Sequence, residues 1–562
     1  MRAILSVWDK TGLVAFARGL EGLGWELYSS GGTQQALAAA GVAVRSVSDL
    51  TAFPELLDGR VKTLHPRLHA GILARRDVPA HLAQLAEHGV GPIDLVVSNL
   101  YPFVETIAAR DVPAGALVAD GSAPEAALPA HVLEAIEQID VGGPALTRAA
   151  AKNFEHVVVV TDPADYPAVL DALRRGTVSR AMRAMLAQKA FAHTAQYDAY
   201  VSQYLAALNG DRFPAAIALP LSREVLLTYG ENPHQEAALY RLADPRLTGE
   251  TLAGVEQLKG EAVSYNNLLD LDNAYAIVAE FDEPAVAIVK HNNPCGAGIG
   301  ATLAEAYRKA FQGDPLSAFG GVVAANQEVD LETARAMRPT LYWVLVAPGY
   351  SEPALRYLER NKKSLRVFRA PVPRPAGAVE GGAPGAILPV FALGYRQVRG
   401  GFLAQTRDAV LSSAVAFRQV SRRAPTEQEL DDLRFAWRVV KHVKSNASVF
   451  ARDGAIVGTG AGQMSRVDSV VAANHVARRS ANRLAAGEDE GAGGAAARRP
   501  AAGCVMATDG FFAFPDAVEA AAEAGVTALA HPGGGKSDAE AAAAADRLGL
   551  AMVVTGYRHF RH

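Results

Sequence analysis

Residues 25–41 read WELYSSGGTQQALAAAG, and this stretch decides the class of fold at the start of the chain. The residues WELYS are typical of a β-strand, and the Ala- and Leu-rich residues after the glycines predict a helix. Gly31 and Gly32 lie between the two as a turn signal. A strand that leads through a short turn into a helix is one step of a βαβ unit, whose strands pair in parallel. The stretch therefore predicts an α/β fold.

The same alternation continues over the first 200 residues. Ala- and Leu-rich helical segments such as LVAFARGLEGL (13–23) separate short apolar runs. Strands that alternate with helices at this spacing imply a parallel sheet that is covered on both faces. The predicted strands are AILSV (3–7), WELYS (25–29), VAVRSV (42–47), DLVVSNLY (94–101) and HVVVVTD (156–162).

The composition turns to Gly, Pro and Ala at residues 205–220, LAALNGDRFPAAIALP, which is typical of a domain boundary. We therefore expect one domain over residues 1–204 and a second over residues 205–562. The α/β pattern resumes in the second domain, with predicted strands AVAIV (285–289), GGVVAA (320–325), WVLVA (343–347), AIVGTG (455–460) and AMVVTG (551–556). Three low-complexity stretches are predicted to be surface loops: 110–132, 371–389 and 484–503.

Composition excludes several classes of protein. A chain of 562 residues is too long for one hydrophobic core, and its 50% hydrophobic and 20% charged residues fit a globular protein. The net charge of −4 gives no reason to expect a nucleic-acid or membrane surface. Two cysteines, Cys295 and Cys504, are too few for a disulfide scaffold or a thiolate zinc site. With neither a signal peptide nor an apolar run of spanning length, a cytoplasmic location is expected.

The stretch VAIVKHNNPCGAGIG (286–300) places a cation and an imidazole at the end of a buried strand. Neighbouring strand residues point to opposite faces, so Lys290 and His291 can serve one ligand only if the strand ends there. Asn292-Asn293-Pro294 is predicted to break the strand. An ammonium beside an imidazole favours the neutral imidazole, which is a usable general base, while the lysine can hold developing negative charge.

A second Lys-His pair occurs later in the chain. IVKHNNPCGAG from residue 288 and VVKHVKSNASV from residue 439 both place Lys-His after two apolar residues. A duplicated substructure and the chance recurrence of a dipeptide both explain this echo. Pro294-Cys295-Gly296 also resembles part of a cytidine-deaminase zinc strand, but the second cysteine of that motif is missing, so zinc is rejected.

The first domain carries stretches that suit a phosphate. Ser29-Ser30-Gly31-Gly32-Thr33 opens a helix, whose N-terminal N–H groups favour an anion, although a plain turn with a capping hydroxyl is the commoner use. LLDGRVKTLHPRLHAGILARR (56–76) gathers Lys and Arg into a phosphate-binding or merely solvated loop. His65 and His69 have the spacing of a helical metal pair, but Pro66 argues against it, and no metal is expected.

EQIDVGGPALTRAAAKN (137–153) pairs a carboxylate with a glycine-rich helix start. Asp140 can handle a proton while the backbone N–H groups of Gly142 and Gly143 stabilise an oxyanion. Tyr101 lies at a predicted strand end, where open α/β sheets bind ligands.

Taken together, these motifs resemble one family along nearly the whole chain. The strings are SVWDKTGL, SSGGT, DGRVKTLHPRLHAGILARR, NLYPF, IDVGGPALTRAAAKN, AFAHTAQYDAY, YGENPHQ, SYNNLLDLDNA, VKHNNPCG, DPLSAFGG, VAPGY, VKHVKSNA, GAGQMSRVDS, DGFFAFPDAVEAAAEAGV and YRHFRH. In this order they resemble the bifunctional purine-biosynthesis enzymes that act as AICAR formyltransferase and IMP cyclohydrolase.

The resemblance implies a methylglyoxal-synthase-like N-terminal domain that closes formyl-AICAR to IMP with loss of water. It implies a larger C-terminal domain of two cytidine-deaminase-like α/β subdomains. This domain moves a formyl group from 10-formyltetrahydrofolate to the 5-amino group of AICAR. The family works as a homodimer with transferase sites across the subunit interface, and some members hold a structural monovalent cation.

Residue roles in the transferase follow from the same resemblance. Lys290 and His291 match the catalytic pair, and Asn446 matches a residue that holds the formyl group. The residues that match the AICAR pocket are Tyr229, Asn232, His234, Arg558 and Phe560. Those that match the folate side are Gly460, Gly462, Gln463, Phe511 and Asp516.

The cyclohydrolase residues are implied in the same way. The catalytic matches are Lys62, Tyr101, Asp140 and Lys152. The substrate-binding matches are Lys10, Ser30, Gly31, Gly32, Thr33, Arg60, Thr63, Gly142 and Gly143. Because ring closure is intramolecular, positioning and an oxyanion site can supply most of the catalysis.

The chain departs from the family pattern at positions that bear on substrate affinity. Thr228 stands where an arginine is usual, which removes a strong charge-assisted phosphate contact. Trp8 stands where a serine is usual, beside the phosphate loop. Ala513 replaces a proline and Gly535-Lys536 replaces Ser-Ile. Two alternatives therefore stay open: a formyltransferase with a weakened cyclohydrolase, and a non-catalytic nucleotide sensor, for which Lys290 and His291 would have no use.

Overall fold

The computed structural model describes residues 1–57, 60–108, 115, 117, 128–242, 255–372, 393–410, 412–488 and 501–562. The chain forms two compact units. The first contains Met1–Ser222, Leu242–Arg246 and Pro384–Ala404, and the second contains Arg223–Arg241, Leu247–Ala383 and Gln405–His562. Most of the three predicted surface loops lies outside the described residues. Where they are described, α7 begins at Ala130 and α16 continues to Glu488, so these ends of the loop predictions were wrong.

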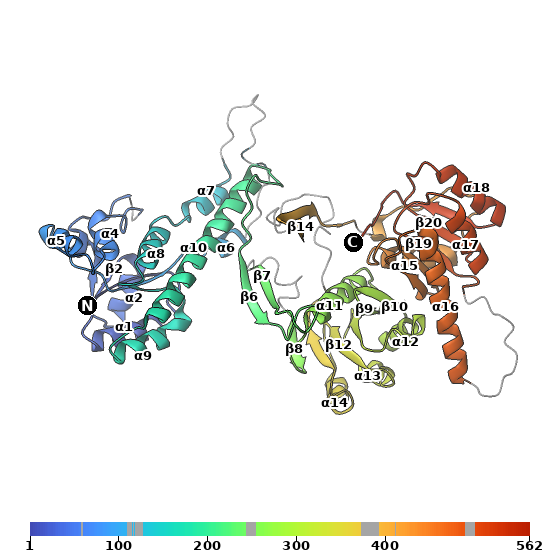
Figure 1. The fold of residues 1–562 in the computed structure, drawn as a ribbon, viewed down its shortest axis with the longest axis horizontal. Coiled ribbons are helices and arrows are strands. Elements are labelled where there is room, and N and C mark those ends of the chain that lie inside the picture. Colours follow the sequence, from blue (N-terminus) through green and yellow to red (C-terminus); the bar gives the residue numbers. More distant parts are fainter. Residues whose placement is uncertain are drawn as a thin grey trace, which may run out of the picture. The chain divides into compact units, whose positions relative to one another are not determined.

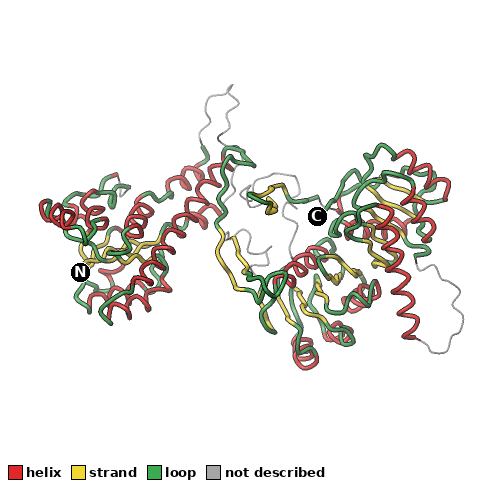
Figure 2. Tube along the Cα trace, in the orientation of Figure 1, coloured by secondary structure: helices red, strands yellow, loops and turns green. Residues whose placement is uncertain are grey.

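The first unit is built on a five-stranded sheet in the order β3-β2-β1-β4-β5, and every pair in it is parallel. Its strands are β1 (Arg2–Val7), β2 (Glu26–Ser29), β3 (Val44–Ser46), β4 (Leu95–Asn99) and β5 (Val158–Val160). All five predicted strands are confirmed. Figure 2 shows these strands in yellow, between helices in red.

Helices cover both faces of this sheet because its strands are apolar on both sides. Leu5 belongs to the core on one face and Ile4 to the core on the other, as the two-residue period of a strand requires. Helices α1 and α9 contribute to the first core, and α4 and α8 to the second (Figure 1). The helices are α1 (Leu13–Gly22), α2 (Gly31–Ala39), α3 (Val47–Thr51), α4 (Pro66–Leu73), α5 (Pro79–Glu87), α6 (Phe103–Ala108), α7 (Ala130–Glu137), α8 (Gly142–Lys152), α9 (Tyr166–Arg174) and α10 (Arg180–Leu208).

The long helix α10 ends where the composition changes. Ser179 caps its N-terminus by accepting a hydrogen bond from the Met182 N–H, and Gly210, directly after the C-cap residue Asn209, has a φ of 67°. The predicted division between residues 204 and 205 falls inside this helix, four residues before Leu208. The division of activities between two domains stays a prediction.

The second unit contains a twelve-stranded sheet in the order β16-β21-β20-β19-β17-β18-β10-β9-β11-β12-β13-β8. Each half has an antiparallel hairpin followed by three parallel strands, and the two hairpins meet at the centre, where Gly298 pairs with Ala455. The first half has β8 (Glu256–Lys259), β9 (Ala285–Lys290), β10 (Asn293–Ile299), β11 (Gly321–Ala325), β12 (Tyr342–Ala347) and β13 (Arg366–Arg369). The second has β16 (Arg418–Gln419), β17 (Ser448–Arg452), β18 (Ala455–Gly460), β19 (Val505–Thr508), β20 (Ala528–His531) and β21 (Ala551–Val554).

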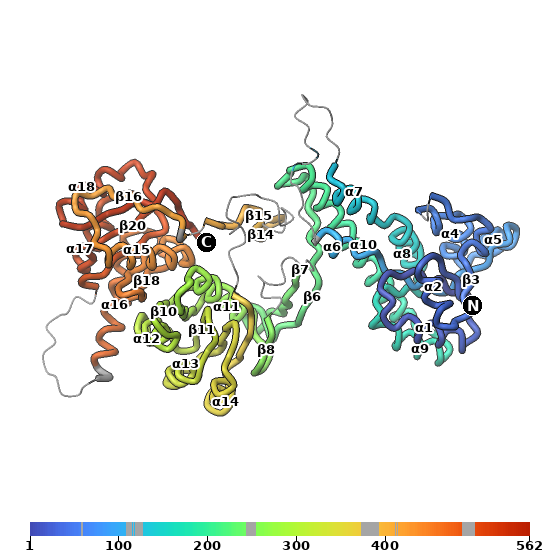
Figure 3. Tube along the Cα trace, turned by 180° about the vertical axis from the view of Figure 1, so that it is seen from behind, coloured from blue at the N-terminus to red at the C-terminus, as the bar shows by residue number. Residues whose placement is uncertain are grey.

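The helices repeat in the same order, so the unit is a duplicated α/β fold and the predicted fold class is confirmed. In the first half α11 (Tyr265–Val278) precedes the hairpin and α12 (Leu303–Gly313) follows it; in the second half α15 (Glu427–Val440) and α16 (Arg466–Glu488) do so (Figure 3). The other helices are α13 (Leu331–Ala336), α14 (Glu352–Asn361), α17 (Asp516–Ala524) and α18 (Asp538–Leu548). Two-stranded ribbons pair β6 (Leu221–Leu226) with β7 (Ala238–Leu242), and β14 (Leu393–Val398) with β15 (Gly401–Thr406).

Glycines on the second strand of each hairpin let a helix cross the sheet closely. A Cβ atom at Gly296 would lie 1.9 Å from the Ala310 carbonyl oxygen in α12. At Gly460 it would lie 1.8 Å from the Ser469 carbonyl oxygen in α16. Because side-chain atoms do not approach backbone oxygens so closely, both positions require glycine.

The repeated Lys-His dipeptide does not mark this duplication. Lys290 and His291 lie at the tip of the first hairpin, whereas Lys441 and His442 directly follow helix α15. The tip of the second hairpin is instead Asp453-Gly454, between β17 and β18. Among the described helices, none is long and apolar enough to cross a membrane.

Candidate functional site

The first hairpin turns tightly at His291 and Asn292. Strand β9 ends at Lys290, as predicted, and Asn293 pairs directly with Lys290 at the start of β10. The prediction that Asn293 and Pro294 break the strand was wrong, because both belong to β10. His291 and Asn292 have φ values of 51° and 59°, which lets a two-residue turn reverse the chain. Only His291 and Asn292 therefore lie outside the two strands of the hairpin.

Two side chains from α11 hold this tip. The Asp270 carboxylate accepts hydrogen bonds from the His291 N–H at 3.2 Å and the Asn292 N–H at 2.5 Å. The Asn273 amide donates to the Asn292 carbonyl oxygen at 2.9 Å. Burial raises the pKa of Asp270, against the effect of the two N–H groups. Side chains of helix α11 thus fix the backbone of the turn that carries His291.

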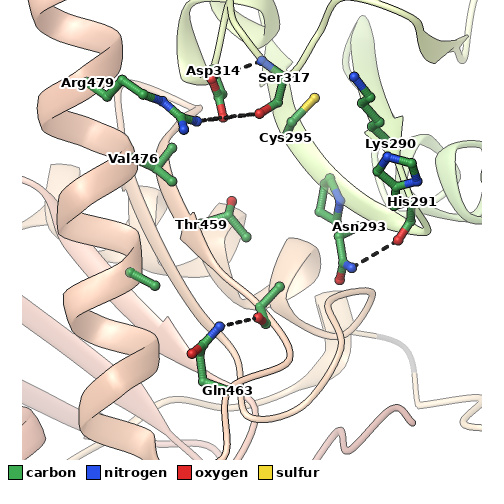
Figure 4. A pocket seen from close by; sticks show the side chains of 13 residues that line it. Lys290, His291, Asn293, Cys295, Asp314, Ser317, Thr459, Gln463, Val476 and Arg479 are labelled. Carbon is green, nitrogen blue, oxygen red and sulfur yellow. Dashed lines mark hydrogen bonds and ion pairs between the residues drawn. The ribbon is translucent and has the colours of Figure 1, made fainter.

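A cavity of about 430 Å³ opens beside the tip, between the two halves of the sheet. Figure 4 shows Lys290 and His291 on one side of it and Arg479 on the other. The lining residues are Lys290, His291, Asn293, Pro294, Cys295, Asp314, Ser317, Thr459, Ala461, Gln463, Ala472, Val476 and Arg479. A cavity of this size is adequate for part of a small-molecule substrate.

The wall opposite the tip joins the two halves through a polar cluster (Figure 4). Arg479 donates to the Asp314 carboxylate at 2.5 Å, and the Ser317 hydroxyl donates to the same carboxylate at 2.6 Å. Ser480 adds a buried hydrogen bond to the Gly313 carbonyl oxygen at 2.9 Å. Burial raises the pKa of Cys295 to about 12, so its thiol stays protonated and is not a nucleophile at neutral pH.

On the second half of the unit, the KSNA and GAGQ segments are bonded to each other. Asn446 and Gln463 exchange backbone hydrogen bonds of 3.0 and 3.3 Å. The Asn446 side-chain amide donates to the carbonyl oxygens of Gln463 and Met464, at 3.0 and 3.2 Å, and accepts from Arg466 at 2.9 Å. Gln463 itself lines the cavity, so the structure brings Lys290, His291 and Gln463 to one site.

The C-terminal residues reach the same region. The Ser445 N–H donates to the Arg561 carbonyl oxygen at 3.0 Å, and the Arg561 guanidinium donates to the Asn273 side chain. The fully buried Asp509 accepts hydrogen bonds from Ser445, Arg466 and the Ala447 N–H. The YRHFRH tail is therefore tied to both the KSNA segment and the helix below the tip.

Other predicted transferase residues lie apart from the cavity wall. Arg558 stacks on the Phe560 ring at 4.4 Å, and both Phe560 and Phe511 are partly exposed. Asp516 begins α17, where its carboxylate accepts from the Ala517 N–H at 2.7 Å.

The YGENPHQ loop lies at the start of α11 without lining the cavity. Tyr229, Asn232 and His234 are exposed. The Tyr229 carbonyl oxygen accepts from the Tyr265 N–H at 3.3 Å. Thr228 donates its hydroxyl to the Val263 carbonyl oxygen at 3.3 Å and supplies no charge in place of the usual arginine.

In the first unit, the SSGGT segment forms the first turn of α2 beside β1. Thr33 accepts from the Val7 N–H at 3.1 Å and donates to the Val7 carbonyl oxygen at 2.8 Å. Ser30 occupies the N-cap position of this helix, but its side chain makes no capping hydrogen bond, and a Cβ atom at Gly31 would lie 3.6 Å from the Lys62 ammonium. The Lys62 ammonium therefore lies beside the first residue of α2, at the end of the helix that the sequence suggested as an anion site.

Asp140 lies just before α8, and both its backbone and its side chain make hydrogen bonds. Its carboxylate accepts from the Gly143 N–H at 2.8 Å, and its own N–H donates to the Tyr197 hydroxyl at 2.7 Å. Burial raises the pKa of Asp140, and the charge of Lys62 acts in the opposite direction. A Cβ atom at Gly142 would lie 2.7 Å from the Thr63 hydroxyl. Lys62, Thr63, Asp140, Gly142 and Gly143 are thus brought together.

Trp8 packs against Tyr101 just beyond the ends of β1 and β4. Their ring centroids are 5.0 Å apart, and the Trp8 N–H donates to the Asn99 side chain at 2.7 Å. The Lys10 ammonium donates to the Trp8 carbonyl oxygen at 3.2 Å. Half of Trp8 is exposed.

Two predicted residues are placed differently. Arg60 pairs with Glu137 at 2.7 Å. Lys152 is exposed in the last turn of α8, ten residues after Gly142, and this length of helix spans about 15 Å. The structure does not bring Lys152 to the Asp140 end of the helix.

Several residues that hold the two sites were not singled out from the sequence. His193 accepts a hydrogen bond from the Leu100 N–H at 3.2 Å and so anchors the Tyr101 loop, while Tyr197 anchors Asp140. Four of these residues occur in strings quoted above: His193 and Tyr197 in AFAHTAQYDAY, and Asp270 and Asn273 in SYNNLLDLDNA. Polar residues among apolar ones on a helix were the available signal. Those that sequence reasoning missed are His193, Tyr197, Asp270, Asn273, Arg466, Asp509 and Arg561.

Comparison with known proteins agrees with this architecture. The family described as AICARFT/IMPCHase bienzyme matches residues 150–476, and the MGS-like domain matches residues 12–120. Three relatives carry the name "Bifunctional purine biosynthesis protein PurH". The protein of Parvibaculum lavamentivorans is 48% identical and covers 100% of this chain and 97% of its own. Those of Desulfitobacterium hafniense and Myxococcus xanthus are also 48% identical, and both cover 100% of this chain. The match covers 99% of the D. hafniense protein and 100% of the M. xanthus protein.

A solved structure titled "Crystal structure of ForH" is 38% identical over 36% of this chain and 98% of its own. Its TM-score of 0.30 is too low to bear on the fold of the whole chain. The full-length relatives and the matched family decide the assignment. The chain belongs to the AICARFT/IMPCHase bienzyme family.

Proposed function

We propose that the cavity beside Lys290 and His291 is the site of formyl transfer, and that the residues around Lys62 and Asp140 form the site of ring closure. The chain is a bifunctional enzyme of purine biosynthesis, with AICAR formyltransferase and IMP cyclohydrolase activities. Formyl-folate is the cosubstrate of the transferase, and we propose 10-formyltetrahydrofolate as the donor. The observation that carries the assignment is the tight turn that presents a cation and an imidazole at the mouth of a cavity.

The transfer reaction needs a base and a group that stabilises an oxyanion. The 5-amino nitrogen of AICAR attacks the formyl carbon, and His291 takes the proton that this nitrogen loses. Lys290 stabilises the negative charge on the formyl oxygen. When the intermediate collapses, the bond to N10 of the folate breaks and that nitrogen is protonated, giving formyl-AICAR and tetrahydrofolate. Asn446, bonded to the Gln463 segment, is proposed to lie beside the formyl group.

Ring closure needs a proton donor for the departing water. The carboxamide nitrogen attacks the formyl carbon within the same molecule, so correct positioning supplies much of the rate. The formyl oxygen leaves as water after it takes up the protons released from nitrogen. Burial raises the pKa of Asp140, and we propose that its carboxyl group carries the proton between nitrogen and the departing oxygen. Lys62 and the N–H groups at the start of α2 are proposed to hold anionic parts of the substrate.

We propose a homodimer in which a second copy completes the transferase site. Tyr229, Asn232 and His234 are exposed and do not line the cavity of their own chain. An exposed cluster of this kind is available to the site of a partner. The assignment of the activities to residues 1–204 and 205–562 belongs to the same proposal.

A structural monovalent cation and a cytoplasmic location remain expectations. Within the described residues, no group of three His, Cys, Asp or Glu side chains could hold a metal ion. The buried Asp509 carboxylate is already bound by Arg466. No step of the proposed chemistry runs through a cation.

The test supplies AICAR and 10-formyltetrahydrofolate to the purified chain and follows tetrahydrofolate release and IMP formation separately. His291→Ala is expected to abolish tetrahydrofolate release while still converting supplied formyl-AICAR to IMP. Asp140→Asn is expected to do the reverse and accumulate formyl-AICAR. If both variants lose both activities, the assignment of separate sites is wrong.

A formyltransferase with a weakened cyclohydrolase is the second candidate. It is favoured by the Trp8 ring, which packs against the proposed catalytic residue Tyr101. Accumulation of formyl-AICAR by the wild-type chain would support it, and equal rates of the two steps would exclude it.

A further inference from the structure

The turn that carries His291 has an unusual backbone. His291 and Asn292 both have positive φ values, 51° and 59°, although neither is a glycine. Residues with side chains adopt this conformation at a cost, and it persists only where the surrounding structure holds it. The question is which residues hold it.

Asp270 is placed to do so. It is a buried residue of α11, 9% exposed, and its two carboxylate oxygens receive the two N–H groups of the turn. Three residues later on the same helix, Asn273 donates to the carbonyl oxygen of Asn292. Hydrogen bonds to an ionised acceptor are among the stronger ones in proteins. The three backbone bonds fix the direction in which the His291 side chain leaves the turn.

The second half of the sheet also has a buried aspartate that holds a hairpin turn, but that turn contains no histidine. Asp432 of α15 is 3% exposed, and its carboxylate accepts from the Gly454 N–H at 2.9 Å. The turn that it holds, Asp453-Gly454, also has positive φ values of 53° and 66°. An aspartate under a left-handed hairpin turn therefore belongs to the duplicated fold. Only the first copy places an imidazole at the turn.

We propose that Asp270 is a positioning residue for formyl transfer, which acts by fixing His291 toward the cavity. This inference rests on the proposed role of His291. Asp270 does not line the cavity and is not a catalytic residue. Its loss leaves the substrate pocket intact but misplaces the base, and a misplacement of about 1 Å costs on the order of 100-fold in rate.

The test is a double-mutant cycle on the full chain. Asp270→Asn keeps the shape of the side chain but replaces one acceptor oxygen with a donor, so the turn loses a hydrogen bond. In the wild-type background, kcat for tetrahydrofolate release is expected to fall roughly 100-fold, while KM for AICAR changes less than about threefold. In the His291→Ala background, the same substitution is expected to change the rate less than about twofold, because there is no base left to misplace.

Asp432→Asn is the matched control, since it removes the equivalent bond from the equivalent turn. Both substitutions are expected to lower the Tm to a similar extent, whereas only Asp270→Asn lowers kcat. Exogenous imidazole added to His291→Ala and to the double variant gives a second measurement, and equal rescued rates are expected. Asn273→Ala perturbs the same turn if Asp270→Asn does not fold, and it is expected to show the same dependence on His291.

The outcomes separate this inference from the proposed function. If Asp270→Asn costs the same factor with and without His291, or if Asp432→Asn lowers kcat equally, Asp270 acts on the fold and the inference is wrong. If His291→Ala releases tetrahydrofolate at the wild-type rate, the proposed function fails, and the positioning role fails with it.

Discussion

Replacement of Gly460 by alanine tests whether this glycine is needed for folate binding or for helix packing. The family resemblance implies that Gly460 belongs to the folate side of the transferase site. The structure instead places it at the end of β18, under the first turns of α16. A Cβ atom there would lie 1.8 Å from the Ser469 carbonyl oxygen and 2.7 Å from its carbonyl carbon. Packing alone therefore requires a glycine at this position.

The size of the effect follows from that distance. Carbon and oxygen atoms that are not bonded lie about 3.3 Å or more apart, so α16 must move by roughly 1.5 Å at Ser469. The movement also disturbs the buried hydrogen bond of 2.7 Å between Ser469 and Ser448. Overpacking costs about 1–3 kcal/mol, and the hydrogen bond about 1 kcal/mol. We expect Gly460→Ala to lower the free energy of unfolding of this unit by about 3 kcal/mol.

Differential scanning calorimetry of the full chain measures this loss. At about 2.1 cal/mol/K of unfolding entropy per residue, a change of about 3 kcal/mol lowers the Tm of a unit of roughly 300 residues by about 4–5 °C. Gly22→Ala is the control, because no atom lies within 4 Å of the added Cβ and its φ is ordinary. If Gly460→Ala melts within about 2 °C of the wild type and binds folate more weakly, the steric argument is refuted and the residue faces the ligand.

Two further predictions concern buried carboxylates. Asp140→Asn should lower kcat for IMP formation from supplied formyl-AICAR by on the order of 100-fold or more, and leave tetrahydrofolate release unchanged; an unchanged rate of IMP formation would remove Asp140 from the mechanism. Burial alone would raise the pKa of Glu280, but the hydrogen bond from His442 and the charges of His442 and Lys441 lower it from 4.5 to about 2. Because this pKa is lowered in the folded state, its stabilisation is complete above about pH 4.5 and is lost as the pH falls toward 2. Urea unfolding at pH 5 and pH 3 should therefore show a smaller loss of stability for Glu280→Gln than for the wild type, and equal losses would contradict the ion pair.

Local patterns were sufficient to predict all the strands of the 5-stranded sheet, but fewer than half of those in the 12-stranded sheet. The ten predicted strands are all present, because each is a short apolar run between turn signals. The turn at His291 was missed because a positive φ at a histidine is rare, so HNNP was interpreted as the end of a strand. Gly296 and Gly458 mark the duplication better than the repeated Lys-His pair does. Each lies four residues after its hairpin turn, where an added Cβ atom would lie 1.9 Å and 2.2 Å, respectively, from a carbonyl oxygen of the helix that follows.

The supporting residues could not be predicted from local patterns. Arg561 bonds Asn273 from 288 positions away, and His193 supports the Tyr101 loop from 93 positions away. Such pairs depend on the tertiary fold, and nothing near either residue in the sequence specifies the partner. Lys290, His291 and Asp140 were also indicated by their local sequence, whereas the other catalytic assignments came from the family resemblance. The structure adds which of those residues share a site.

The central claim is that His291 is the base that accepts the proton of the 5-amino group. A crystal structure of the enzyme with AICAR and an unreactive folate analogue tests it directly. The claim predicts the amino nitrogen about 2.6–3.2 Å from a ring nitrogen of His291, with the Lys290 ammonium facing the position of the formyl oxygen. An amino nitrogen more than about 5 Å from His291, or hydrogen-bonded to a different base, would contradict it.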